Sequence, residues 1–228
     1  MIRLLRSELY ALRTTPGPWL TMSAVAALHL FLVAVIGTPG DRGAAWHGLG
    51  PSAGELTGYP MLLLGVVAAA QDHRFRTIVP VLLTTPGRRR VLAAEAAAVA
   101  VVAAAAASAA QTLWLAAAVR RHGGAAMHTG RPGDLLRLYA VTVAGVVLLG
   151  LLGVALGAIL RNAATAFVIV PIGVIAEAVA PPTRYRGPFT SGLATFGPHP
   201  GSGALLLAGW TVVALTIAVV TVARDVTD

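Results

Sequence analysis

One stretch of this sequence, from Leu138 to Leu160, runs for 23 residues without a charged side chain. An α-helix rises about 1.5 Å per residue, so a stretch of this length can cross the ~30 Å hydrocarbon core of a bilayer. The composition agrees, because 57% of the 228 residues are hydrophobic and only 11% are charged, against about 25% charged in a typical soluble domain. So few charges cannot cover a soluble surface of this size. The sequence therefore predicts an all-α, polytopic membrane protein.

Apolar segments recur along the chain, and they predict a single transmembrane domain over residues 1–228 with six membrane-spanning helices. The connection 37–55 is rich in Gly and Pro, and we expect it to be an external loop. The second apolar segment is short for one crossing, so we expect it either to extend into the polar residues that follow or to lie where the bilayer is thin. The predicted spans are 19–36, 56–71, 91–119, 138–160, 163–180 and 204–223.

Two other segments are predicted to meet the membrane without crossing it. Residues 1–15 place four apolar side chains at helical spacing, with arginines on the other faces. This pattern is typical of an amphipathic helix that lies in the membrane interface, with Trp19 after it as an interfacial anchor. Residues 188–197 are uncharged but number only ten, which favours an external re-entrant turn between the fifth and sixth spans.

Arginine supplies all 17 basic residues, and its distribution predicts the orientation of the chain. An even number of spans puts both termini on one side. If that side is inside, ten of the 17 arginines lie there, five of them between residues 74 and 90. Cytoplasmic loops carry an excess of basic residues, so we expect both termini and the 72–90 connection to be cytoplasmic. The net charge of +8 then indicates contact with anionic lipid rather than nucleic acid.

The absence of cysteine and lysine excludes several chemistries. Without cysteine there is no disulfide and no thiolate metal site. Without lysine there is no G-x-x-x-x-G-K-[ST] phosphate loop and no Schiff base. The six histidines show no metal-ligand spacing, and an intramembrane protease built on Ser191 and His199 is disfavoured because both lie in a Gly/Pro-rich loop. We therefore expect no enzyme activity, no metal and no cofactor on this chain.

The segment 71–95, QDHRFRTIVPVLLTTPGRRRVLAAE, joins an arginine-rich pattern to a short apolar piece. The chain resembles the ABC-2 type permeases, the membrane subunits of a class of ATP-driven exporters, in three segments. They are this segment, RSELYALRTTPGPWL at 6–20 and GAILRNAATA at 157–166. The sequence RYRGPFTSG after the fifth span is similar to the external re-entrant turn of that family. Arg76 and Glu95 stand where the family usually has glycine and lysine.

The resemblance implies a permease subunit of a bacterial ATP-binding-cassette exporter in the cytoplasmic membrane. Such a subunit moves a hydrophobic or amphipathic substrate, such as an antibiotic, a drug or a lipid-like molecule, by alternating access. A separate dimeric ABC ATPase would bind MgATP, and the partner permease would be an identical or a homologous chain. The Ala, Arg and Gly bias without lysine is also typical of a high-GC bacterial genome.

The resemblance further implies that the 72–90 connection couples the permease to the ATPase through a short helix near 77–83. The alternative for this connection is a basic, lipid-facing loop that only fixes the topology. For the whole chain, the alternative is a non-transporting membrane anchor, assembly factor or immunity protein. The expected interfacial-helix residues are Arg6, Glu8, Arg13 and Trp19. The expected coupling residues are Asp72, Arg74, Arg76, Thr77, Ile78, Leu82, Leu83, Pro86, Arg88 and Arg89.

Five residues inside the predicted spans are candidates for a role in translocation or helix packing. His29 and Glu177 are ionisable groups within apolar segments, where such groups are often functional. For His29 the simpler alternative is a neutral histidine that hydrogen-bonds between helices. For Glu177 the alternatives are contact with substrate, pairing with Arg184 or Arg186, and a carboxylate that reaches the interface. Pro171 is expected to kink the fifth span. Gly153 and Gly157 form a G-x-x-x-G pair, which allows close helix contact either within the chain or between two permeases.

Overall fold

The structure, a computed structural model, describes residues 2–35, 44–74, 88–122, 132–179, 187–196 and 200–224. These residues form eight α-helices and no strand, which confirms the predicted all-α class. The helices are α1 (Ile2–Thr14), α2 (Pro16–Val35), α3 (Ala44–Arg74), α5 (Arg88–His122), α6 (Pro132–Leu160), α7 (Ala163–Val179), α8 (Pro188–Thr195) and α9 (Pro200–Arg224).

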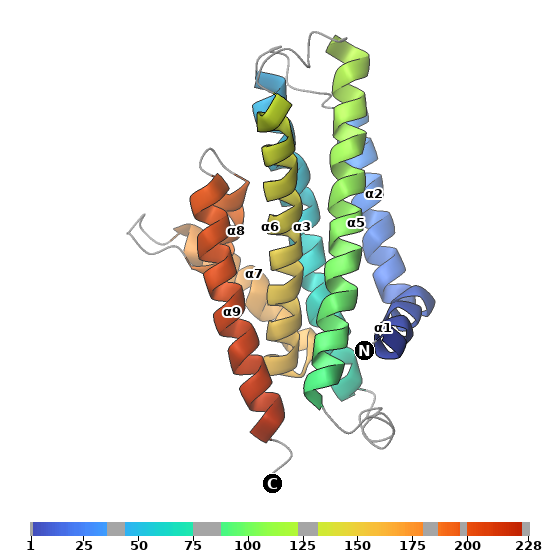
Figure 1. Cartoon of the computed structure of the whole chain (residues 1–228), viewed down its shortest axis with the longest axis vertical. Helices are drawn as coiled ribbons and strands as arrows, with labels where there is room; N and C mark the ends of the chain where they lie inside the picture. Colours follow the sequence, from blue (N-terminus) through green and yellow to red (C-terminus); the bar gives the residue numbers. More distant parts are fainter. Residues whose placement is uncertain are drawn as a thin grey trace.

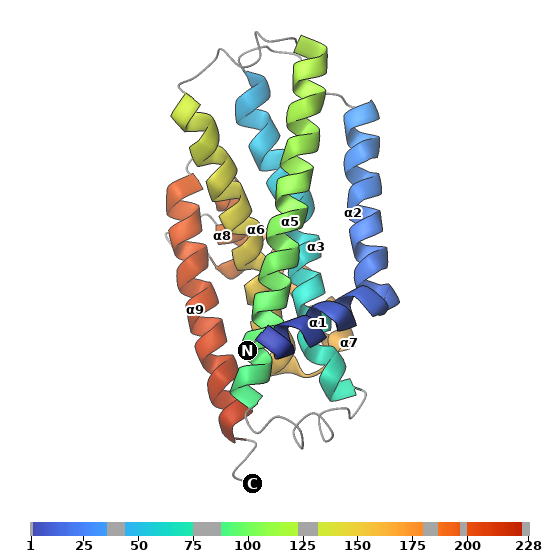
Figure 2. The same cartoon turned by 45° about the vertical axis from the view of Figure 1, so that its right-hand side comes forward.

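The longer helices form an up-and-down bundle (Figures 1 and 2). Helices α2, α5 and α7 run in one direction, and α3, α6 and α9 run back. As a result, α1, the end of α3, the start of α5, the α6–α7 turn and the end of α9 all lie toward one end, which we call the terminal end. The opposite end, which holds the end of α5 and the start of α6, is the distal end.

Four of the described helices are long and apolar enough to cross a membrane, which fits a membrane protein. Two further helices, α2 and α7, carry shorter apolar stretches, Pro18–Leu32 and Ala163–Glu177. The 17 residues of α7 extend for only about 25 Å at the α-helical rise. Four of the six predicted spans therefore correspond to helices of sufficient length. Their apolar windows are Ala53–Ala70, Arg89–Ala117, Leu136–Leu160 and Gly201–Ala223.

The second predicted span is part of a longer helix than the sequence suggested. Helix α3 begins at Ala44, so residues 44–55 of the predicted external loop 37–55 are helical, and it ends at Arg74, which agrees with the expected extension into the polar residues after residue 71. The Gly and Pro content argued for a loop, because both residues have poor helix propensity. In the rest of α3, 61% of the Ala53–Ala70 window is inside the bundle, and packing supplies most of the stability of helices in proteins.

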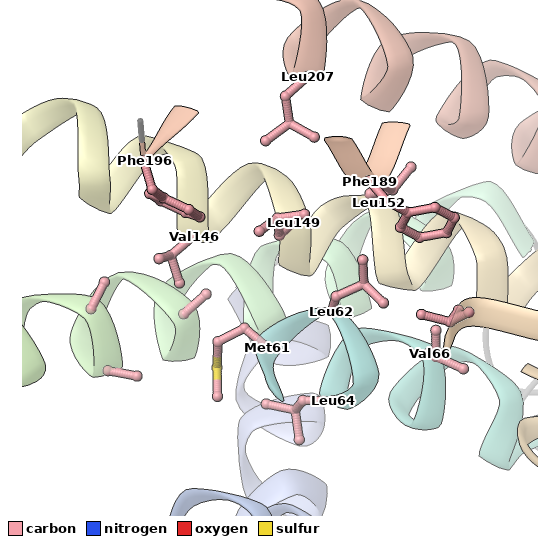
Figure 3. Close-up of a cluster of buried hydrophobic side chains, with 14 of the residues drawn as sticks. Met61, Leu62, Leu64, Val66, Val146, Leu149, Leu152, Phe189, Phe196 and Leu207 are labelled. Atoms are coloured by element: carbon pink, nitrogen blue, oxygen red, sulfur yellow. The ribbon is translucent and has the colours of Figure 1, made fainter. Parts of the chain in front are cut away.

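The centre of the bundle is the contact between α3 and α6, and glycines bring the two helices close together. A Cβ atom at Gly153 would collide with the carbonyl oxygen of Leu62, and one at Gly157 would collide with that of Val66. Small residues permit such backbone approach between membrane helices. The G-x-x-x-G pair is thus used within the chain, beside the buried cluster in Figure 3.

The outer helices expose most of their apolar side chains. Only 22% of the Gly201–Ala223 window of α9 is buried, and α7 exposes six large hydrophobic residues, including Phe167 and Ile172. Helix α2 also exposes Leu30 and Phe31. Contiguous apolar surface of this extent is typical of a lipid-facing or protein-facing exterior.

The α6–α7 turn needs only two residues. Arg161 has φ 54°, the left-handed conformation that commonly ends a helix. The Asn162 side-chain oxygen then accepts a hydrogen bond from the Ala164 amide at 3.0 Å. This is an N-cap interaction, and it starts α7 immediately after α6 ends.

Candidate functional site

Most of the predicted ATPase-coupling segment lies outside the described residues. This holds for Arg76, Thr77, Ile78, Leu82, Leu83 and Pro86, and for the proposed helix near 77–83. Asp72 and Arg74 belong to the last turn of α3, and Arg88 and Arg89 to the first turn of α5. Of these four side chains the structure describes Arg89, which is exposed. Both flanking helix ends lie at the terminal end (Figure 2).

Glu177, near the end of α7, holds the start of α8. One oxygen of its side chain, Oε2, accepts hydrogen bonds from the Phe189 amide at 3.1 Å, the Thr190 amide at 2.8 Å and the Thr190 hydroxyl at 2.9 Å. The first amides of a helix have no partner within it, and the positive end of the helix dipole attracts a carboxylate. Glu177 therefore acts as an N-terminal cap donated by a different helix.

All backbone donors in the first turn of α8 are accounted for. Pro188 has no N–H, and proline is favoured at this first helical position for that reason. The next two amides bind Glu177, and the Ser191 amide donates to the Gly187 carbonyl at 3.0 Å. Gly187 itself is required by the cap, since a Cβ there would collide with the Glu177 carboxylate.

Helix α8 packs most extensively against α9, and α3, α6 and α7 supply the rest of its surroundings. The Tyr59 hydroxyl of α3 donates to the Phe189 carbonyl at 3.3 Å. Gly173 of α7 leaves room for the Phe189 ring, and Phe196, just after α8, is buried against glycines of α3 and α6. Figure 3 shows Phe189 and Phe196 beside the apolar side chains of α6. One carboxylate, one hydroxyl and two buried rings thus add to the packing of this short helix against α9.

Sequence reasoning found Glu177 but not its partners. The interfacial carboxylate and substrate-contact interpretations did not include α8, and Tyr59 and Thr190 were not recognised as partners. One local signal was available, because Gly187-Pro188 followed by Phe-Thr is a typical helix start. The same helix bears on the protease alternative: the Ser191 hydroxyl is fully buried and has no hydrogen-bond partner among the described residues.

His29 connects α2 to α3. Its side chain is 2% exposed, its Nδ1 lies 2.7 Å from the Val25 carbonyl oxygen, and its Nε2 lies 3.3 Å from the Thr57 hydroxyl. A carbonyl only accepts, so Nδ1 carries the hydrogen in this contact. The Thr57 hydroxyl also lies 2.7 Å from the Ala53 carbonyl. With His29 neutral, that single hydroxyl hydrogen is shared between Nε2 and Ala53.

The remaining predicted residues lie on helices α1, α2, α6 and α7. Arg6 and Arg13 are exposed on α1, and Glu8 is half-buried there. The Trp19 indole N–H donates to the Arg13 carbonyl, which ties the start of α2 to the end of α1. Pro171 lies inside α7, which continues through it from Ala163 to Val179. Gly153 and Gly157 belong to the α3–α6 contact.

The chemistry available in the described part of the chain is hydrogen bonding and packing. Its residues contain no group of three or more His, Asp or Glu side chains that could hold a metal ion. No protein-family model, curated protein or solved structure matches the chain. Among the polar contacts between the described helices, those of Glu177 with α8 and of His29 with Thr57 involve ionisable groups inside apolar helices, and they are the candidate functional features.

Proposed function

We propose that this chain is the membrane-spanning permease subunit of an ATP-binding-cassette exporter. In this proposal it moves a hydrophobic or amphipathic substrate, such as an antibiotic, a drug or a lipid-like molecule, out across the bacterial cytoplasmic membrane. A separate ATPase dimer binds MgATP, and a second permease, identical or homologous, completes the pathway. This chain does not hydrolyse ATP.

One observation carries the proposal. Helix α3 ends and α5 begins at the terminal end, where α1 and the end of α9 also lie (Figure 2). The arginine-rich connection between α3 and α5 thus leaves the bundle on the side of both chain ends. A cytoplasmic ATPase needs a docking segment there, and a rigid contact between the two would transmit ATP-driven closure to α3 and α5.

The packing of the remaining helices agrees with a six-span permease. Helix α2 runs along the bundle, and the shorter α7 runs from the terminal end toward α8 (Figure 1). In this proposal both cross the bilayer together with the four longer helices. Helix α8 takes the place of the external re-entrant turn, with Glu177 and Tyr59 holding it against the bundle. Both termini are then cytoplasmic.

The decisive experiment replaces Ile78 and Leu82 together by aspartate. In this proposal the two side chains are buried against the ATPase, and each unpaired charge placed in such a contact costs several kcal/mol. We expect normal amounts of the variant in the membrane, but loss of the ATPase from pull-downs and loss of transport. The matched control, Ala125→Asp with Thr129→Asp, changes the α5–α6 connection at the distal end and should retain the ATPase.

A variant that keeps its ATPase at normal abundance would show that the 72–90 connection is only a topology signal. If no ATPase co-purifies with the parent chain, the non-transporting anchor, assembly or immunity protein becomes the better assignment. Orientation is tested separately, because the chain has no cysteine. In intact cells an impermeant thiol reagent should label Arg120→Cys and should reach Thr84→Cys only after permeabilisation; the opposite pattern refutes the orientation.

A further inference from the structure

The N-terminal helix uses its apolar side against the protein. Helix α1 lies across the bundle near the terminal end and contacts α5 and α2 (Figure 2). Leu5, Leu9 and Leu12 are half-buried, whereas Tyr10 is 68% exposed. An isolated interfacial helix would turn its apolar stripe to the lipid. Here that stripe is already partly covered by protein, so the polar side of the helix is the part left for another partner.

Two arginines occupy this uncovered side in a regular arrangement. Arg6, Tyr10 and Arg13 follow one another at helical positions i, i+4 and i+7, which places them on one stripe of α1. All three side chains are exposed. The Trp19 indole donates to the Arg13 carbonyl, so the end of this stripe is tied to the start of α2.

The helix that α1 contacts also carries exposed positive charge in its first turn. Arg89 and Arg90, in the first turn of α5, are both exposed, and α5 is the helix that α1 contacts. Of the acidic side chains described on these two helices, Glu8 is half-buried and Glu95 is buried. We define Arg6, Arg13, Arg89 and Arg90 as the basic rim.

The basic rim lies near exposed apolar surface rather than polar surface alone. Trp19 is 55% exposed and Leu20 is 70% exposed, directly after the elbow between α1 and α2. A ligand that satisfies both features carries negative charge beside hydrocarbon. Anionic phospholipid has this chemistry, since its phosphate attracts arginine and its acyl chains cover the apolar start of α2. An acidic protein surface would satisfy the charge and leave Trp19 and Leu20 without a partner.

We propose that the basic rim and the start of α2 bind anionic phospholipid, with the headgroup phosphate on the arginines and the acyl chains along Trp19 and Leu20. This goes beyond transport, because it requires only that the chain lies in a bilayer. It gives α1 a defined role as a lipid-binding element that sets the depth of the terminal end relative to the headgroups.

The test uses Trp19 as its own reporter in the full-length chain. Trp46→Phe and Trp210→Phe leave Trp19 and the buried Trp114 as the tryptophans. The chain is reconstituted in phosphatidylcholine vesicles in which dibrominated phosphatidylglycerol or dibrominated phosphatidylcholine replaces a rising share of the lipid. Bromine quenches tryptophan fluorescence on contact. We expect phosphatidylglycerol to be preferred at Trp19 at least about fivefold, the effect of one arginine at a charged surface.

Two charge-matched variants then locate the preference. Arg6→Gln with Arg13→Gln should lower the ratio of the two quenching affinities toward one, with only Arg89 and Arg90 of the basic rim left to favour phosphatidylglycerol. Arg120→Gln with Arg137→Gln removes the same charge from exposed positions on the distal half of the bundle and should leave the ratio unchanged. Equal quenching by both lipids in the parent chain, or the same loss in both variants, would overturn the proposal. Neither outcome depends on an ATPase, so failure here is distinct from failure of the proposed function.

Discussion

Removing the Glu177 side chain is the sharpest test of how α8 is held. In Glu177→Ala the amides of Phe189 and Thr190 lose their common acceptor, Oε2. Because no other part of α8 can accept these two hydrogen bonds, the start of the helix must either open or admit water. We therefore expect α8 to detach locally while the α3–α6 core remains folded.

The free energy that α8 loses in Glu177→Ala follows from the contacts that this side chain makes. An orphaned buried donor costs about 1–3 kcal/mol, and the carboxylate at the helix N-terminus contributes about 0.3–1 kcal/mol. Glu177 is only half-buried, so water replaces part of the loss, and we expect roughly 2–4 kcal/mol. At about 1.4 kcal/mol per factor of ten, this corresponds to roughly 30- to 1,000-fold more opening of α8.

Glu177→Gln separates the charge from the geometry. All three hydrogen bonds converge on one oxygen, and the amide oxygen of glutamine can take that position. Only the charge is then lost, so we expect a change of about 1 kcal/mol, or about fivefold more opening. We therefore predict that opening of α8 decreases in the order Glu177→Ala, Glu177→Gln, parent chain.

The assay is amide hydrogen exchange of the α8 segment in the reconstituted chain, read by mass spectrometry. Exchange through local opening reports the free energy of that opening. Glu8→Ala is the control, because it removes the same group from a half-buried position of α1, at the terminal end of the bundle, and should leave α8 protected. If α8 exchanges equally fast in Glu177→Ala and Glu8→Ala, the carboxylate does not hold this helix and the reasoning is wrong.

Three further predictions concern the helix contacts. Gly153→Ala should lower the thermal stability of the detergent-solubilised chain by several degrees, because its Cβ meets the Leu62 carbonyl, whereas Gly209→Ala, which meets nothing within 4 Å, should not lower it. Asn162→Ala should cost about 1 kcal/mol in equilibrium unfolding by losing the α7 cap, and Asn162→Asp should retain it. Thr57→Val should cost about 1–3 kcal/mol in the same assay by leaving the His29 Nε2 unpaired, and adding His29→Leu should cost less than the sum of the single changes. Additive effects at the last pair would argue against a direct contact.

The all-α class and the apolar helices can be predicted from the sequence, because both depend on residues that are close together along the chain. Hydrophobicity over about 20 neighbouring residues decides whether a helix can enter a bilayer, and the 3.6-residue period predicts the N-terminal amphipathic helix. Each of the six predicted spans accordingly lies within, or one or two residues beyond, a helix that the structure contains. The extension of the second span into the polar residues after it was one of the two expected outcomes, and α3 does extend to Arg74, but its start at Ala44 within the predicted loop 37–55 was not expected.

Only the tertiary structure decided what the polar residues contact. His29 meets Thr57, 28 residues away; Glu177 meets Thr190, 13 residues away; and Gly153 meets the backbone at Leu62. The sequence marked each of these residues as unusual for an apolar helix, but not which neighbour would satisfy it. An unsatisfied polar group in an apolar interior is costly whatever its partner is, so its presence is visible in the sequence. The partner is chosen by the arrangement of helices that are distant along the chain, and no local pattern encodes that arrangement.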